Sequence, residues 1–265
     1  MTYQGGKATI AKRLAGILQT YFDNAECGLF LEPFVGGNHI LQHIKAPSKI
    51  ASDSNEAMIT FWKAVQDGWE PATEWLSPEE YVRLKATQDP KDPMTALAGV
   101  GCSFGGKWFG GYARSTKGAE YQGTNYMAVA MQQAKKQLDK DVLFLHVDYK
   151  DIIESWAGAF IYCDPPYRGT LKYNSNDFDS DAYYDVLRDA VSRGNFVACS
   201  EYSMPEDFRV AQTFEKRHCL DNRGLGHRVR TERLFLHESQ YEQLTGEKLD
   251  NSTTFTFDDF RASTA

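Results

Sequence analysis

The chain of 265 residues is long enough to bury one sizeable hydrophobic core, or a core domain that carries a smaller one. With 42% hydrophobic, 25% charged and 13% aromatic residues, its composition is that of an ordinary globular protein, which excludes wholesale disorder and collagen-like or repetitive architectures. The formal net charge of -7 excludes a surface coated in basic charge, so any contact with nucleic acid has to come from local patches.

Membrane, disulfide and metal sites are not predicted. The sequence has no run of about 18 apolar residues, and its N-terminus has no apolar block behind the charges, so we expect neither a membrane span nor a signal peptide, and a cytoplasmic location. The five cysteines lack a C-x-x-C spacing and the six histidines lack metal-ligand spacing. We therefore expect reduced, mostly buried thiols and no bound metal.

Strands and helices alternate along most of the chain. The spacing of apolar residues predicts helices from Ile10 to Tyr21 and after a candidate N-cap at Asp179 or Ser180. Apolar and β-branched runs predict buried strands at 28–34, 49–53, 142–147, 159–163, 196–200 and 233–237, with 253–257 as a possible edge strand. This alternation predicts an open, largely parallel α/β sheet covered on both faces.

The interval 56–140 breaks the alternation because its pattern is mostly helical. One helix stops at Gly68, a capping box at Ser77–Glu80 opens another, and a third runs from Met127 to Leu138. A glycine-rich loop separates them. We therefore predict an inserted helical subdomain at 56–140 within a discontinuous domain formed by residues 1–55 and 141–265.

The most informative segment reads Asp-Pro-Pro-Tyr directly after the apolar run Ala159–Cys163. A strand that ends here places a carboxylate, Asp164, and an aromatic ring, Tyr167, at the carboxyl edge of the sheet, where open α/β sheets bind ligands. Between them, Pro165 and Pro166 form a rigid turn whose missing N–H groups leave nearby carbonyls free to accept from a ligand. Such a site suits an amino group that needs two acceptors. The plain alternative is a strand end at which Asp164 caps the following turn.

A glycine turn and a second acidic strand end give weaker signals. The run Gly28–Asn38 is an apolar strand followed by a Gly-Gly turn, at which the backbone can approach a ligand closely. Glu32, near the strand end, can accept from a cationic amine. Asp53, which ends the next predicted strand, can accept from a ribose diol in a nucleoside-binding α/β fold. Each feature alone is commonplace.

Together with the N-terminal segment Tyr3–Lys7, these motifs resemble the Dam-like DNA adenine methylases of the α group of amino-methyltransferases. The order matches over nearly the whole chain: Tyr-x-Gly-Gly-Lys, the Leu-Glu-Pro-Phe-x-Gly turn, Asp53, an inserted recognition region and Asp-Pro-Pro-Tyr. Where the family usually has another glycine before a small residue, this chain has Asn38 and His39. Because asparagine tolerates a left-handed backbone, we expect the turn to survive.

The resemblance implies a Rossmann-like, S-adenosylmethionine-dependent methyltransferase fold. It also implies transfer of a methyl group to the exocyclic N6 of an adenine flipped out of double-stranded DNA. The cofactor-binding residues that it implies are Tyr3, Lys7, Glu32, Phe34, Gly36, Asp53, Asp148, Tyr149 and Asp164. Of these, Asp148 and Tyr149 would flank the cofactor's adenine; alternatively, they only cap the turn that follows their strand.

In the catalytic segment implied by the resemblance, Asp164 and the Pro165 carbonyl accept from the target amine, Pro166 fixes the turn, and Tyr167 stacks on the target base. Accepting both amine hydrogens directs the nitrogen lone pair at the methyl group, so positioning supplies the rate.

Basic residues interleaved with aromatic ones suit contact with phosphates and base edges. The DNA-binding residues that we predict are Lys107, Trp108, Tyr112, Arg114, Lys117 and Arg228. A solvated surface loop is the plain alternative for these charges. Cytosine-N4 or RNA-adenine methylation remains an alternative activity, and a DNA-binding relative without turnover remains a third hypothesis.

Overall fold

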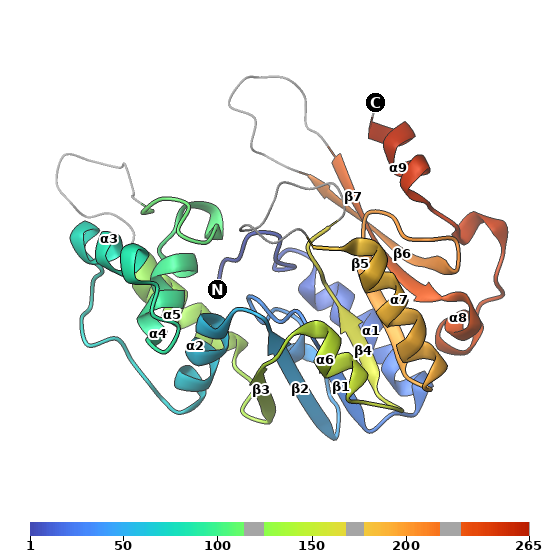
Figure 1. Cartoon of the computed structure of the whole chain (residues 1–265), viewed down its shortest axis with the longest axis horizontal. Helices are drawn as coiled ribbons and strands as arrows, with labels where there is room; N and C mark the ends of the chain where they lie inside the picture. The colour runs from blue at the N-terminus through green and yellow to red at the C-terminus, as the bar shows by residue number, and fades with distance from the viewer. Residues whose placement is uncertain (114–124, 168–177, 218–228, 265) are drawn as a thin grey trace. The chain divides into compact units, whose positions relative to one another are not determined.

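The computed structural model describes residues 1–113, 125–167, 178–217 and 229–264. Seven strands form a mixed sheet in the order β3-β2-β1-β4-β5-β7-β6 (Figure 1). Their bounds are β1 Leu29–Glu32, β2 Ser48–Asp53, β3 Val142–His146, β4 Phe160–Cys163, β5 Phe196–Glu201, β6 Phe208–Arg217 and β7 Val229–His237.

Five of the described α-helices fall where the apolar spacing or a capping residue predicts them, and the other four were not predicted. Ser77 caps its helix by accepting from the backbone N–H of Glu80 at 3.1 Å, and Asp179 caps another by accepting from two backbone N–H groups. The helices are α1 Ala11–Ala25, α2 Glu56–Gln66, α3 Pro78–Thr87, α4 Pro93–Ala96, α5 Tyr126–Gln137, α6 Tyr149–Glu154, α7 Ser180–Ser192, α8 Glu238–Thr245 and α9 Phe257–Thr264.

The chain divides into two compact units that do not follow sequence order. The first unit comprises Met1–Ala15, Val35–Ile44 and Lys49–Tyr149. The second unit comprises Gly16–Phe34, Lys45–Ser48 and Lys150–Ala265. Each unit has its own buried aromatic core.

In the first unit, β2 and β3 pair in parallel, with Asp53 opposite His146 at their carboxyl ends. The fully buried Trp62 of α2 stacks on Phe144 of β3, with ring centroids 6.1 Å apart. The described part of the interval 56–140 contains helical segments and one isolated β-bridge, Ser103 to Tyr112, but no strand. The predicted helical character of this interval is confirmed.

In the second unit, β1 pairs with β4 and β4 with β5 in parallel, whereas β7 is antiparallel to both of its neighbours. The sheet is therefore mixed: the predicted parallel pairing is confirmed for β2 with β3, β1 with β4 and β4 with β5, and the antiparallel hairpin of β6 and β7 was not predicted. The strand order reverses between β1 and β4, and the carboxyl ends at such a switch point are where open α/β sheets bind ligands. Stacked rings of Phe30 and Phe160, 5.4 Å apart, hold these two strands together.

The expected edge strand at 253–257 is wrong. Only Thr254 forms a bridge, to Arg209, and helix α9 begins at Phe257. The Thr256 backbone N–H donates to Asp259 at 2.7 Å, as in a capping box, which favours a helix start over further strand pairing.

Strand β6 was not predicted from the sequence. Among its residues whose burial is described, only Phe208 and Phe214 are fully buried, so the alternation of apolar and polar residues is weak.

Asn195 ties β4, β5 and α7 together in the second unit. This fully buried side chain accepts from Ala159 N–H at 3.0 Å and donates to the carbonyls of Trp156 and Ala190 at 2.8 and 3.1 Å. We expect Asn195→Ala to lower the free energy of unfolding by about 2–4 kcal/mol, because buried polar backbone groups lose their partner. Urea unfolding would measure this. Thr20→Ala, at an exposed position on α1, is the control, and equal stability of both variants would contradict the assignment.

Candidate active site

In the second unit, the four residues of β4 are all buried and lead directly into Asp164 and the two prolines. Glu32, only 3% exposed, stands at the carboxyl end of the adjacent parallel strand β1. The predicted acid and aromatic ring therefore lie at the ligand-binding edge of the sheet. We use the name β4 cluster for the five residues that gather there: Glu32, Tyr162, Asp164, Tyr167 and Glu232.

Negative charge dominates the β4 cluster. Burial raises the pKa of Tyr162 well above its usual value, and the carboxylates of Asp164, Glu232 and Glu32 raise it further. Its hydroxyl shares a hydrogen bond of 2.9 Å with Ser200 on β5. The cluster therefore combines two neutral tyrosine hydroxyls with three carboxylates that interact electrostatically. Such a site favours a cationic ligand and disfavours phosphate.

Tyr167 is anchored at its hydroxyl. The hydroxyl donates to Oε1 of Glu232 at 2.6 Å, and its ring meets the Tyr202 ring edge-to-face at 4.7 Å. Burial raises the pKa of Tyr167 well above its usual value, with Asp164 and Glu232 adding to the shift, so the hydroxyl keeps its proton and donates. Glu232 on β7 and Tyr202, which directly follows β5, were not predicted, because no sequence motif links either residue to Tyr167.

Two buried thiols lie beneath this edge. Tyr183 of α7 is 3.2 Å from the sulfur of Cys199, and burial raises the pKa of Cys163 to about 12. Such thiols are scarcely ionised near neutral pH, so they act as small apolar groups. The described cysteines are all free and three of the four are buried, as expected; Cys219 lies outside the described residues.

Phe34 closes one side of this region in the second unit. Its ring meets those of Phe178 and Tyr183 edge-on, at 6.1 and 5.9 Å. An aromatic wall beside carboxylates offers both electrostatic and cation–π attraction to a positively charged ligand.

In the first unit, the glycine turn is held by Asp53. One carboxylate oxygen accepts from Gly36 N–H and the other from Asn55 N–H, each at 2.9 Å. The indole N–H of Trp62 donates to the Gly36 carbonyl at 2.9 Å. Sequence reasoning treated Trp62 only as a core residue of a helix, and no local signal marks its bond to the turn.

Gly36 has a φ of +40°, and a Cβ there would lie 3.0 Å from the Tyr3 ring. The turn therefore needs glycine both for its backbone conformation and for the close approach of Tyr3. Asn38 adopts a φ of +50°, which confirms that asparagine supports the left-handed position. His39 is buried and bonded to Gln137 at 2.6 Å, and Lys7 is only 2% exposed.

The structure places the remaining predicted cofactor residues at a strand-to-helix junction. Tyr149 is the first residue of α6, and the exposed Asp148 precedes it. This position agrees with either interpretation of the pair, as a ligand contact or as the start of the following helix.

The predicted DNA-binding residues separate into exposed and packed ones. Lys107 is exposed, whereas Trp108 donates to Gln88 at 2.9 Å and the Tyr112 hydroxyl donates to the Leu76 carbonyl at 2.5 Å. The last two side chains therefore also brace the helical region.

Near Lys107, the side chain of Phe104 is 71% exposed, which the sequence did not predict. Arg114, Lys117 and Arg228 lie outside the described residues.

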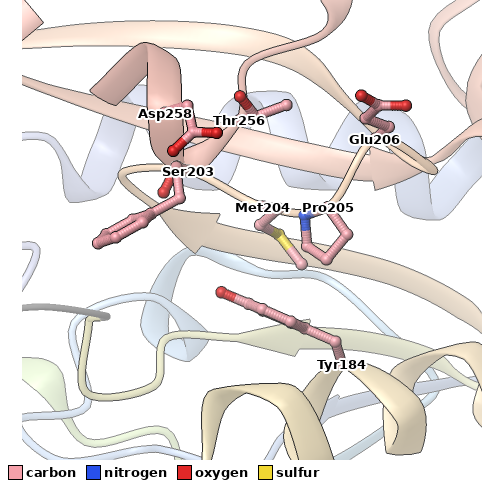
Figure 2. A pocket seen from close by; sticks show the side chains of 8 residues that line it. Tyr184, Ser203, Met204, Pro205, Glu206, Thr256 and Asp258 are labelled. Atoms are coloured by element: carbon pink, nitrogen blue, oxygen red, sulfur yellow. The ribbon is translucent and has the colours of Figure 1, made fainter. Parts of the chain in front are cut away.

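A separate pocket of about 200 Å³ opens in the second unit. Figure 2 shows the Tyr184 side chain extending from its helix toward Met204 and Pro205, with the carboxylates of Glu206 and Asp258 on the opposite side. Two acids at this pocket disfavour phosphate. It is lined by residues outside the β4 cluster, so we do not assign the acceptor site to it.

The residues present fit S-adenosylmethionine by their chemistry. Its sulfonium and ammonium groups are positive, and the β4 cluster combines carboxylates with aromatic rings. The described residues contain no group of three or more His, Cys, Asp or Glu side chains arranged to hold a metal ion. Among the described helices, none has the length and apolarity required to cross a membrane.

The fold and site define an α/β protein with a ligand-binding edge rich in acids and aromatic rings, at the switch point of a mixed seven-stranded sheet. Residues 3–92 match the family model described as D12 class N6 adenine-specific DNA methyltransferase. This confirms the resemblance over the N-terminal third of the chain, including the glycine turn and Asp53. No curated protein sequence is similar enough to count as a relative.

Several solved structures resemble the chain weakly. An rRNA methyltransferase, aviRa, from Streptomyces viridochromogenes has 11% identity and a TM-score of 0.37, with 89% of this chain and 88% of that chain covered. A precorrin 8W decarboxylase from Methanobacterium thermoautotrophicum has 7% identity and a TM-score of 0.37, with 85% and 89% covered. Likenesses of this strength carry no argument about function.

Asp53→Ala tests the role of the carboxylate in the glycine turn. We expect the free energy of unfolding to fall by about 1–3 kcal/mol, because two backbone N–H groups lose their acceptor. Burial raises the pKa of Asp53 above its ordinary 3.8, so the folded protein keeps this proton to a higher pH than the unfolded chain. The stability advantage of the wild type should therefore decline as pH rises through the folded pKa. Denaturant unfolding from pH 4 to 8 measures it, and an advantage that grows over this range would contradict the raised pKa.

Proposed function

We propose that the protein transfers a methyl group from S-adenosylmethionine to the exocyclic N6 of adenine in double-stranded DNA, at a specific sequence. The observation that carries the proposal is the position of Asp164 and Tyr167 at the carboxyl end of β4, beside the end of β1. The family match of residues 3–92 supports it independently, because that match does not include the Asp-Pro-Pro-Tyr segment.

The acceptor chemistry follows from the lone pair of the adenine amine, which is delocalised into the ring. In this proposal the Asp164 carboxylate and the Pro165 carbonyl each accept one amine hydrogen, while Pro166 keeps the turn rigid. The nitrogen then pyramidalises, and its lone pair would attack the methyl carbon in line. The N–C bond would form as the S–C bond breaks, S-adenosylhomocysteine would leave, and the surplus amine proton would pass to Asp164 or to water. Such positioning is worth about 7–11 kcal/mol in favourable systems. Tyr167 offers its ring for stacking on the base, which has to leave the DNA stack first, at a cost of a few kcal/mol.

When bound, S-adenosylmethionine supplies the electrophilic methyl group. We assign its positive groups to Glu32 and Asp164, with Phe34 as an aromatic neighbour, on the basis of burial and charge in the second unit. In the first unit we assign to its binding the residues Tyr3, Lys7, Gly36, Asp53, Asp148 and Tyr149. Asp53 already accepts two backbone N–H groups, and its oxygens keep further lone pairs for ribose hydroxyls.

We assign DNA recognition to the helical interval 56–140. The exposed Lys107 and the exposed Phe104 are braced by a short bridge between Ser103 and Tyr112. A cation for phosphate and a ring for base contact on a braced loop suit DNA, whereas scattered charges on a mobile surface would not be held in register. Arg114, Lys117 and Arg228 belong to this proposal by sequence alone.

Two alternative functions use the same site. The acceptor pair would also bind the amine of cytosine in DNA or of adenine in RNA, and mass analysis of the methylated nucleoside separates these products. A DNA-binding relative without turnover is the other alternative. The intact acids of the β4 cluster disfavour a decayed site, because buried carboxylates without a function cost stability.

Asp164→Ala tests the mechanism. With tritiated S-adenosylmethionine and duplex DNA from a host without adenine methylation, the wild type should label the DNA. The variant should lose at least about a hundredfold in rate, because both alignment and one acceptor are removed. Asp141→Ala, at an exposed position before β3, is the control. Undiminished labelling by a folded Asp164→Ala protein would refute the mechanism, and no labelling by the wild type would refute the function.

Lys107→Ala tests the DNA surface. Each phosphate contact contributes about 0.9 to the slope of log affinity against log salt, so we expect weaker binding and a slope that is smaller by about one. Fluorescence anisotropy with a labelled duplex measures the affinity and its salt slope, at salt concentrations from roughly 50 to 200 mM. Lys85→Ala, an exposed lysine of α3, is the control. An unchanged slope would remove Lys107 from the interface.

A further inference from the structure

We propose that Glu232 and Tyr202 are positioning residues that fix the Tyr167 ring for the acceptor base, and that Phe260 of the C-terminal helix α9 supports Tyr202. The proposal rests on the proposed function. It adds two strands and a helix, β5, β7 and α9, to the set of elements on which methyl transfer would depend.

Glu232 is a charged residue in the interior of the antiparallel hairpin. It is 3% exposed, pairs with Phe214 across β6 and β7, and accepts the Tyr167 hydroxyl at 2.6 Å. Placing a carboxylate inside a strand is costly unless it is hydrogen-bonded. An apolar residue would suit that strand position better if packing were the only requirement, so the carboxylate points to a role in holding the tyrosine.

Tyr202 holds the ring of Tyr167 from the side. The two ring centroids are 4.7 Å apart at an interplanar angle of 81°, the edge-to-face arrangement that aromatic pairs favour. The hydroxyl bond fixes one end of Tyr167, and the Tyr202 ring restricts rotation about the side chain. A ring restrained in this way does not have to be ordered when a base arrives.

Tyr202 is itself fixed by two further contacts. Its ring stacks on Phe260 at 5.2 Å, with the planes only 6° apart. Its carbonyl accepts from Arg233 at 2.9 Å, and the Arg233 guanidinium lies 3.3 Å from the centroid of the Phe255 ring. The segment around α9 therefore buttresses the ring that contacts the Asp-Pro-Pro-Tyr motif, although the two are about 90 residues apart in sequence.

A purely structural role predicts a different outcome from a positioning role. Loss of packing alone would lower the unfolding temperature and leave the rate constant of the folded enzyme unchanged. Loss of ring orientation lowers kcat, because a small misplacement near the reacting atoms costs up to about a hundredfold in rate. In the Tyr202 and Phe260 variants, which leave every carboxylate of the β4 cluster in place, the Michaelis constant for S-adenosylmethionine should change little.

The experiment compares Glu232→Gln, Tyr167→Phe and their double variant with the wild type, using the full chain, tritiated S-adenosylmethionine and duplex DNA. We expect Tyr167→Phe, which removes the bond, to lower kcat roughly 10- to 100-fold, and Glu232→Gln, which replaces the charged acceptor by a neutral one, to lower it less. The double variant should be no slower than Tyr167→Phe, because that change already removes the bond that Glu232→Gln weakens. Glu215→Gln, on the neighbouring strand β6, is the matched control. Thermal unfolding verifies that each protein is folded.

The aromatic contact is tested in parallel by Tyr202→Leu and Phe260→Leu. We expect Tyr202→Leu to lower kcat at least about tenfold, and Tyr202→Phe to restore most of the loss because it keeps the ring. If the wild type labels DNA and the Glu232 and Tyr202 variants turn over at its rate, the positioning role is overturned while the proposed function stands. If the wild type labels no DNA, both are overturned.

Discussion

A fully buried strand that ends in two prolines is the constraint on which the rest of the site depends. Because β4 pairs in parallel with β1 and β5, its carboxyl end is fixed in register with the ends of both neighbours. The prolines permit no continuation of the ladder, so the chain has to leave the sheet at Asp164. The acid is therefore the first residue after the strand, and the ring follows it across the two prolines. That arrangement gives an acceptor site the precision that in-line attack requires.

Several carboxylates lie close together at the carboxyl ends of β1 and β4. Glu32 and Glu232 are nearly inaccessible to water, and together with Asp164 they add to the rise in the pKa of Tyr162 that burial causes. Mutual repulsion among carboxylates is relieved when a cation binds among them. Under the proposed function, these carboxylates would attract the sulfonium and ammonium groups of the cofactor.

Strands and helices with strong periodicity were predictable from the sequence. β1 to β5 and β7 lie where buried apolar runs occur, and α2 and α3 begin at the residues whose side chains cap them. β6 was not predicted because few of its residues are buried. α9 was not predicted because the segment 253–257 before it was interpreted as a strand, whereas Thr256 and Asp259 form a capping contact there. A sequence pattern predicts a strand or helix when burial of that element leaves a regular spacing of apolar residues.

The sequence predicted the candidate site residues that lie in one continuous motif, but not those that the fold brings together from distant segments. Asp164 and Tyr167 follow from one stretch of sequence, whereas Glu232 and Tyr202 reach Tyr167 only through strand pairing. Similarly, the sequence predicted a ribose contact for Asp53, which stays a prediction, but did not predict the bond that Asp53 accepts from the backbone of the glycine turn. A sequence reveals residue types at a strand end, but only the fold specifies which distant side chains support them.

The most direct measurement is the identity of the nucleoside that acquires the methyl group. Duplex DNA would be incubated with the protein and S-adenosylmethionine carrying a deuterated methyl group, digested to nucleosides and analysed by mass spectrometry. We expect deuterated N6-methyldeoxyadenosine with the wild type and none when Asp164 is replaced by alanine. Label found on cytosine, or in no deoxynucleoside at all while the protein binds the cofactor, would contradict it.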